Sequence, residues 1–211
     1  HARTTEAEGM QLLAEYYDMP VADINYLHIA ESIAEFIRAK FAVQESKFHD
    51  FVFNQDALSD DELSGAMLFY GKGKCSTCHS GPLLSDLDFH AVPFPQLGYG
   101  KNGFGIDYGK YNSTHNPSDL YKFRTPPLLD VDNTFPYSHS GGVDGLKEAI
   151  IFHFDPLRYL ELDQMSSMDR TEFYKRLSLG TQSEMLAIYL NDKEVDQLIA
   201  FLITLSFNPI D

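Results

Sequence analysis

The run Cys75-Ser76-Thr77-Cys78-His79 constrains this chain more than any other feature of its sequence. The spacing C-x-x-C-H is the attachment signature of c-type haem. Each thiol can add to a haem vinyl group, and His79 can coordinate the iron from the proximal side. The run uses both cysteines of the 211-residue chain. We therefore expect one covalently bound haem c, and a fold that wraps around this large, flat, apolar group.

Two other kinds of site use a C-x-x-C pair. A redox dithiol is expected in a βαβ context, which this sequence does not suggest, and a zinc site needs more soft ligands than the chain offers. Covalent haem is the leading interpretation.

The amino-acid composition and net charge of the chain limit the classes of molecule that it can bind. Sixteen Phe and twelve Tyr with no Trp suit an aromatic interior around a flat cofactor. The net charge of −15 argues against nucleic acid and anionic membranes as partners. It is compatible with docking of a small basic electron-donor protein, and equally with a solvated acidic surface. No apolar run approaches membrane-spanning length.

The start of the chain carries no signal peptide, whereas covalent haem attachment usually takes place outside the cytoplasm. We therefore expect a processed or truncated exported protein, periplasmic or otherwise outside the cytoplasm.

Apolar residues at helical spacing predict a mostly helical protein. A capping box at Ser59 and Glu62 marks one helix start. Between 81 and 142, clustered glycines and prolines predict a long irregular segment, of a length that haem wrapping would explain. No convincing set of strands is present. The expected helices cover 21–43, 60–71, 143–154, 169–177, 181–190 and 192–206, the last with a buried stripe of Val195, Leu198, Ile199, Leu202 and Leu205.

The far side of the iron needs a Met, a His, a Tyr or an open position. The methionines are poor candidates, since they lie on the helix before the motif, in a polar stretch or in the core; they are Met67, Met165, Met168 and Met185. His153, among Ile and Phe, is the strongest candidate, because a buried His needs a partner. The residues alone leave it equally open as a ligand or a core histidine. The other histidines, which fit structural or surface roles better, are His28, His49, His90, His115 and His139.

From about Ile24 to its end, the chain resembles the bacterial di-haem cytochrome c peroxidases and their MauG-like relatives. Four blocks carry the resemblance beyond the haem motif and its flanks, which run from Gly71 to Asp86. They are Phe89-His90 with the glycines after it, Phe123-Arg124-Thr125-Pro126-Pro127-Leu128, Thr134-Phe135-Pro136-Tyr137-Ser138-His139-Ser140-Gly141 and Leu146-Lys147-Glu148-Ala149-Ile150.

The resemblance implies an all-α, class I cytochrome c-like haem domain with long irregular haem-wrapping loops. Residues 56–211 would be the C-terminal haem domain, and residues 1–55 a helical linker or tail of a missing N-terminal haem domain. Arg124, in the second block, would join Cys75, Cys78 and His79 in binding the cofactor.

The family also implies iron and calcium ligands. Its axial ligand after the last block is Met in the peroxidases and Tyr in MauG, and an ungapped count places His153 there. A His/His pair lacks the potential-raising Met and leaves no open position for peroxide. Calcium would bind between the two domains, partly through the backbone carbonyls of Thr134 and Pro136.

The function expected from this resemblance is electron transfer within a peroxidase-type oxidoreductase. The family has two haems, and the peroxide-reacting one is usually N-terminal, so the partner would be an N-terminal haem domain or a second chain. Hydrogen peroxide would be the substrate. A MauG-like enzyme that oxidises a protein residue, and a stand-alone mono-haem electron carrier, are the alternatives.

Overall fold

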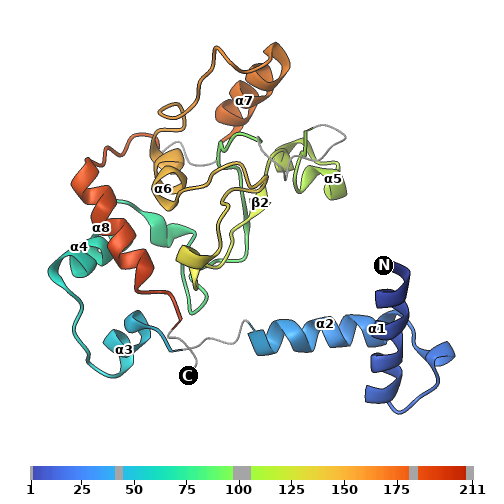
Figure 1. Cartoon of the computed structure of the whole chain (residues 1–211). Coiled ribbons are helices and arrows are strands. Elements are labelled where there is room, and N and C mark those ends of the chain that lie inside the picture. Colours follow the sequence, from blue (N-terminus) through green and yellow to red (C-terminus); the bar gives the residue numbers. More distant parts are fainter. Residues whose placement is uncertain (1, 41–44, 97–105, 181–184, 208–211) are drawn as a thin grey trace. The chain divides into compact units, whose positions relative to one another are not determined.

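A computed structural model describes residues 2–40, 45–96, 106–180 and 185–207, which fall into two compact units, 1–44 and 45–211 (Figure 1). The first unit holds α1 (Ala2–Tyr16), the short 3-10 helix η1 (Val21–Asp23) and α2 (Tyr26–Lys40). The Tyr17 hydroxyl, just after α1, donates a hydrogen bond of 3.2 Å to the backbone carbonyl of His28 in α2. The two helices are thereby joined into one hairpin.

The predicted amphipathic helix over 21–43 is confirmed in type, as α2. Its apolar stripe is not covered, because Ile29, Ile33 and Phe36 are 37%, 54% and 59% exposed. Phe41, the last expected member of the stripe, lies outside the described residues. The described residues of the first unit by themselves therefore leave this face uncovered.

The second unit is mostly helical, as expected, and its described part contains one small sheet. β1 (Phe89–His90) and β2 (Phe123–Arg124) pair antiparallel, with Phe89 opposite Arg124. The α-helices are α3 (Lys47–Phe53), α4 (Asp60–Tyr70), α5 (Tyr111–Thr114), α6 (Leu146–Phe154), α7 (Ser167–Leu179) and α8 (Asp192–Ile203). The 3-10 helices are η2 (Cys75–Thr77), η3 (Pro117–Asp119) and η4 (Val131–Asn133).

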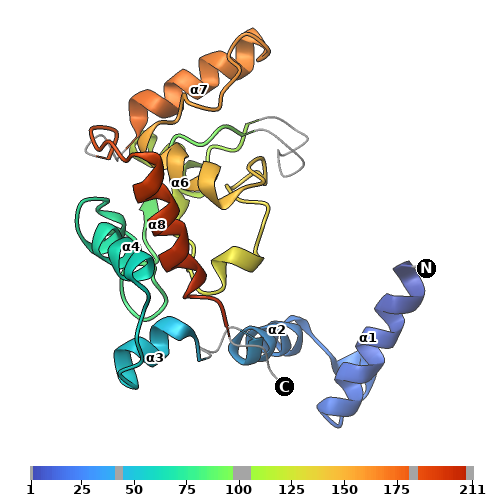
Figure 2. The same ribbon diagram turned by 60° about the vertical axis from the view of Figure 1, so that its left-hand side comes forward.

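The core lies where α4, α8 and α6 pack side by side, with α7 beyond α6 (Figures 1 and 2). The Ser59 capping box that begins α4 is present as predicted, with Glu62 donating its backbone N–H to Ser59 Oγ. The stripe predicted for α8 is confirmed as well. Four of its members are buried and Ile199 is partly buried, and the apolar residues they pack against include Phe69, Ile150, Ile151 and Phe201.

The tight crossing of α4 and α8 depends on Gly65. A Cβ atom built at this position would overlap the backbone carbonyl oxygen of Gln197 in α8 and would lie 2.8 Å from Cβ of Phe201. A glycine therefore lets the two helix backbones approach closely, at a position inside a helix where glycine otherwise destabilises.

The two compact units divide between residues 44 and 45, and the predicted division after residue 55 into a tail and a haem domain stays a prediction. Residues 47–53 form the short helix α3, whose Phe48 ring packs edge-on against Phe201 with centroids 5.2 Å apart. The Phe48 backbone N–H also donates to the carbonyl of Thr204. The second unit therefore begins at residue 45, whereas the origin of the first unit as a tail of another domain stays a prediction.

Two further sequence expectations need correction. The helix expected over 181–190 is wrong for its described part, because residues 185–190 form a turn and an extended segment that bury Met185 and Leu190. Met168 lies in the first turn of α7, not in a loop. The glycines of the irregular segment at 98, 100, 103 and 105 lie outside the described residues. No helix in the described ranges is long and apolar enough to cross a membrane.

We predict that Gly65→Ala lowers the free energy of unfolding by about 1–3 kcal/mol, because the added methyl group forces α4 away from α8. Gly9→Ala in α1 is the control, since a Cβ there meets nothing within 4 Å. Denaturant unfolding followed by circular dichroism measures both. Equal stability of Gly65→Ala and the parent would contradict the close crossing.

Candidate haem-binding site

A cavity of about 650 Å³ opens inside the second unit, and we call it the central cavity. Apolar residues from α4, α6 and α8 line it, among them Phe69, Ile150 and Leu198. Its described lining includes both cysteines, two arginines and three further histidines besides His79, but no Asp or Glu. A large apolar chamber with a few polar groups is the usual form of a cofactor site.

His79 and His153 face each other across the central cavity. Their ring centroids are 6.5 Å apart, although the residues come from the turn after η2 and from α6. Phe94 meets the His153 ring edge-on at 5.2 Å and so helps to fix its orientation. The structure therefore brings together the two residues that the sequence analysis named as proximal and distal iron ligands.

Both imidazoles have the same nitrogen committed to the backbone. Nδ1 of His79 lies 3.1 Å from the carbonyl oxygen of Leu84, and Nδ1 of His153 lies 2.8 Å from that of Ala149. Because a carbonyl only accepts, each Nδ1 carries the proton and each Nε2 keeps a free lone pair. This backbone bond is the outer support that metal-bound histidines usually have.

Burial keeps both rings neutral. It lowers the pKa of His79 to about 4, with a further contribution from the nearby His153, and it lowers the pKa of His153 as well. Neutral imidazole is the form that binds metal.

The spacing of the two rings fits one metal ion between them. Two metal–nitrogen bonds of about 2 Å each, plus the distance of roughly 1.2 Å from each ring nitrogen to its centroid, separate the centroids by about 6.4 Å. The observed 6.5 Å agrees with this sum.

The two cysteines do not have the character of a redox pair. Both are free thiols, and burial raises the pKa of Cys75 to about 12 and also raises that of Cys78. Redox-active C-x-x-C pairs instead have a lowered thiolate pKa. Cys75 and Cys78 line the central cavity on the same stretch of chain as His79, so the residues present fit a covalently held haem.

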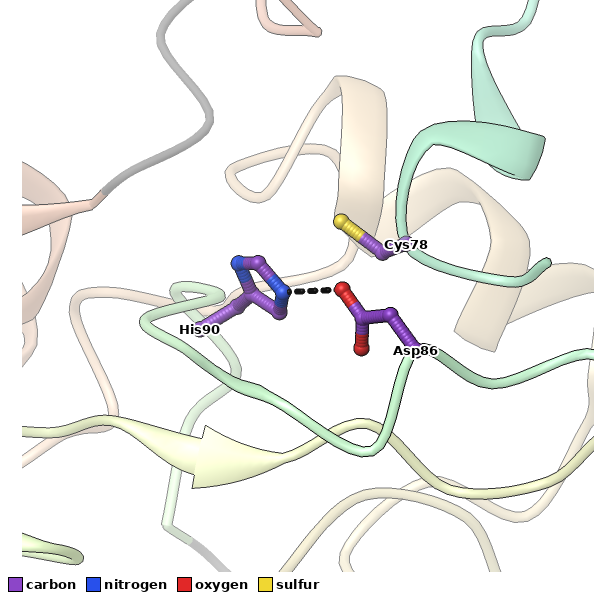
Figure 3. Close-up of side chains that lie close together, drawn as sticks. All are labelled: Cys78, Asp86 and His90. Atoms are coloured by element: carbon purple, nitrogen blue, oxygen red, sulfur yellow. Dashed lines mark hydrogen bonds and ion pairs between the residues drawn. The ribbon is translucent and has the colours of Figure 1, made fainter.

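Asp86 and His90 lie beside Cys78 and were not expected there (Figure 3). His90 Nε2 is 2.8 Å from Asp86 Oδ2, and the ligand atoms of all three residues lie within 4.8 Å of one another. Burial raises the pKa of Asp86, but hydrogen bonds from His90, Thr125 and the backbone lower it on balance. The group offers a metal three ligands only while the Cys78 thiol is free, and a thioether bond to haem would remove the sulfur.

The remaining predicted residues fall at the rim of the cavity or away from it. Arg124, Thr134 and Pro136 line the cavity and are exposed, and the calcium site assigned to the last two stays a prediction. His139 also lines the cavity, where its Nε2 lies 2.9 Å from Asp107 Oδ2.

The methionines considered as iron ligands differ in their exposure to solvent. Met67 and Met168 are 70% and 66% exposed, whereas Met185 is buried in the cavity wall as the core residue it was expected to be.

Sequence reasoning missed Arg176. It is a buried residue of α7 that reaches the cavity wall, and nothing in the local sequence separates it from a surface arginine of an amphipathic helix.

Comparisons with known proteins agree with this site. The chain is 30% identical over 178 residues to the cytochrome-c peroxidase IdrP1 of Pseudomonas sp. (strain SCT), an alignment covering 74% of this chain and 42% of that protein. It is 29% identical to the methylamine utilization protein MauG of Methylorubrum extorquens, over 86% of this chain and 45% of MauG. The chain spans about half the length of the curated relatives it matches, and no family model matches it.

The fold agrees too. The crystal structure of the diheme peroxidase BthA from Burkholderia thailandensis superposes on 93% of this chain and 55% of that one, with a TM-score of 0.74 and 21% sequence identity. The predicted all-α, cytochrome c-like fold class is therefore confirmed.

We predict that Cys75→Ala combined with Cys78→Ala abolishes covalent attachment of haem. The parent should keep its haem through denaturation and extraction with acidified organic solvent, because thioether bonds survive both, whereas the double variant should lose it. Absorbance of the protein and solvent fractions measures the outcome. Release of the haem from the intact parent would contradict the assignment.

We also predict that the parent haem is six-coordinate and low-spin, and that His153→Ala opens one axial position. Carbon monoxide should then bind the reduced variant at least tenfold more tightly than the parent, since no imidazole has to leave. His115→Asn is the control, because His115 is exposed and lies outside the cavity wall. If the absorption spectrum of His153→Ala matches the parent, another residue is the ligand.

Proposed function

We propose that this chain, a homologue of the bacterial di-haem cytochrome c peroxidases and MauG, is the electron-transfer haem unit of a peroxidase-type oxidoreductase. The observation that carries the proposal is the pairing of His79 and His153 across the central cavity. Two side-chain ligands on one iron leave no axial position for peroxide, so a haem held here serves to pass single electrons.

Each residue has a distinct part in this proposal. Cys75 and Cys78 hold the haem, His79 and His153 bind its iron, and the apolar wall of the cavity keeps water away. The bound haem supplies a reversible one-electron centre. Two imidazole ligands give it a lower potential than a His/Met pair would. Arg124 at the rim completes the cofactor-binding set.

The peroxide-reacting haem belongs, in this proposal, to an N-terminal domain or a second chain. One C-x-x-C-H in a chain that spans about half of its relatives supports this view. Hydrogen peroxide is then the substrate of the assembly, and a calcium ion bound by the Thr134 and Pro136 carbonyls lies at its domain interface.

The cellular compartment and the electron donor of the assembly are inferred from the covalent haem and the charge of the chain. We place the assembly in the periplasm, where covalent haem proteins are matured, and we assign a small basic protein as its electron donor, because the chain carries a net charge of −15. A MauG-like enzyme would use the same haem unit to oxidise a protein residue. A stand-alone electron carrier is the competing function from another class.

We predict that the 211-residue chain consumes hydrogen peroxide slowly, at a rate at least a hundredfold below that of an assembly with its N-terminal haem domain. If His79 and His153 both bind the iron, an imidazole would have to leave before peroxide could reach it. Stopped-flow mixing of peroxide with the haem-loaded chain measures this rate, and His153→Ala should raise it.

The measured rate of peroxide consumption distinguishes the proposed function from its alternatives. Fast peroxide consumption by the parent chain would show that this haem is itself the reactive one. Slow consumption, together with no gain in any assembly but rapid electron exchange with a basic cytochrome, would favour the stand-alone carrier.

A further inference from the structure

Arg176 is a buried cation in the wall of the central cavity. It lies in the third turn of α7, and its residue surface is only 4% exposed. Its Nε and Nη1 atoms are buried without a hydrogen-bond partner among the described residues. Buried charged donors are costly to leave unsatisfied, so these two atoms need an acceptor that the described part of the chain does not supply.

The residues around Arg176 contact its guanidinium group but do not accept hydrogen bonds from its Nε and Nη1 atoms. Its central carbon lies 5.8 Å from the ring centroid of Tyr121 and 6.0 Å from that of Phe173. The nearest carboxylate that acts on it, Glu172, is already engaged on both oxygens. Oε2 accepts a hydrogen bond of 2.6 Å from the Tyr121 hydroxyl, and Oε1 accepts one of 2.5 Å from Lys175 Nζ.

The charges around Arg176 at the wall of the central cavity favour binding of a negatively charged group. Burial lowers the pKa of the Arg176 guanidinium, although it stays charged at neutral pH, and the negative charges of Glu172 and Asp169 only partly oppose this effect. No Asp or Glu occurs in the described lining of the central cavity, whereas two arginines, Arg124 and Arg176, do. The described lining of the cavity is therefore mostly apolar and carries two arginines but no carboxylate.

A haem brings the missing anions. It carries two propionates, on the half of the macrocycle opposite the two vinyl groups that cysteines attack. Cys75 and Cys78 follow α4 directly, and Figures 1 and 2 both show α7 on the far side of α6 from α4. Arg176 thus comes from a helix that lies on the other side of α6 from the helix preceding the cysteines, as a contact with the propionate half of a haem bound through them would require.

We infer that Arg176 binds a haem propionate inside the cavity wall, and that Tyr121, Phe173 and Glu172 position its guanidinium group for this contact. This inference rests on the proposed haem site and adds to it a buried ionic anchor that the haem motifs of the sequence do not contain. It also assigns a function: a fixed positive charge at the haem edge favours the reduced iron and raises the reduction potential.

The test is the midpoint potential of the haem-loaded chain, measured by spectroelectrochemistry in three variants. Arg176→Gln should shift the potential to a lower value, because the propionate loses its counter-charge. Arg176→Lys should restore most of the shift, since the charge remains. Arg170→Gln should leave the potential unchanged, because Arg170 lies on the same helix but outside the described cavity wall.

The absorption spectrum and the covalent attachment of haem distinguish a failure of the haem site from a failure of the inference about Arg176. Each variant must keep the low-spin spectrum and the covalently attached haem of the parent. If the parent chain itself shows neither property, the proposed haem site is refuted, and the role of Arg176 is not tested by that result. With the site intact, a parental potential in Arg176→Gln, or an equal shift in Arg170→Gln, would overturn the inference.

A measurement on the unaltered chain covers the case in which Arg176→Gln does not fold. With arginine labelled by ¹⁵N in its guanidinium group, reduced-minus-oxidised infrared difference spectra should contain an arginine band, because the anchored propionate senses the charge of the iron. Arg176→Lys should lose this band and Arg170→Gln should keep it. Absence of any label-sensitive band in the parent would overturn the inference.

Discussion

Two neutral, partly buried imidazoles, His79 and His153, whose ring planes are inclined at 68°, are the constraint around which the second unit is organised. Each has its Nδ1 bound to a backbone carbonyl, so each directs a free Nε2 lone pair into an apolar cavity. Neither ring can satisfy the other, because two acceptors do not form a hydrogen bond. A metal ion between them satisfies both at once, and the 6.5 Å separation of the rings suits it. In the proposed function the cofactor completes this site and would form part of the core.

The helices around this pair provide the rigidity that the geometry needs. α4 and α8 cross closely at Gly65, and the chain leaves α4 directly into the turn that carries both cysteines and His79. His153 comes from α6, which packs against the same core. The proximal and distal sides are therefore fixed by elements that share one apolar interface, so their separation is set by packing.

The cavity matches the chemistry of haem from one edge to the other. It is lined mostly by apolar side chains, its two cysteines lie on the segment that follows α4, and Arg176 reaches its wall from α7. Both oxygens of the neighbouring Glu172 already accept hydrogen bonds from other residues, so the proposed propionate would supply the acceptor that the buried Arg176 lacks. The group of Cys78, Asp86 and His90 shows the opposite case, since covalent attachment of haem takes away the thiol that a metal there would need.

The sequence by itself determined what depends on neighbours along the chain. The C-x-x-C-H run, the capping box at Ser59 and the stripe of α8 are local patterns, and each is present as predicted. The short helix α3 and the turn at 185–190 escaped this reasoning, because packing against Phe201 and burial of Met185 outweigh local preference there. Only the tertiary structure showed that the His153 and His79 rings lie 6.5 Å apart, and that Nε and Nη1 of Arg176 are buried without a hydrogen-bond partner among the described residues. Spacing along a chain fixes which residues share a helix face, whereas contacts between distant segments are fixed by how the helices pack.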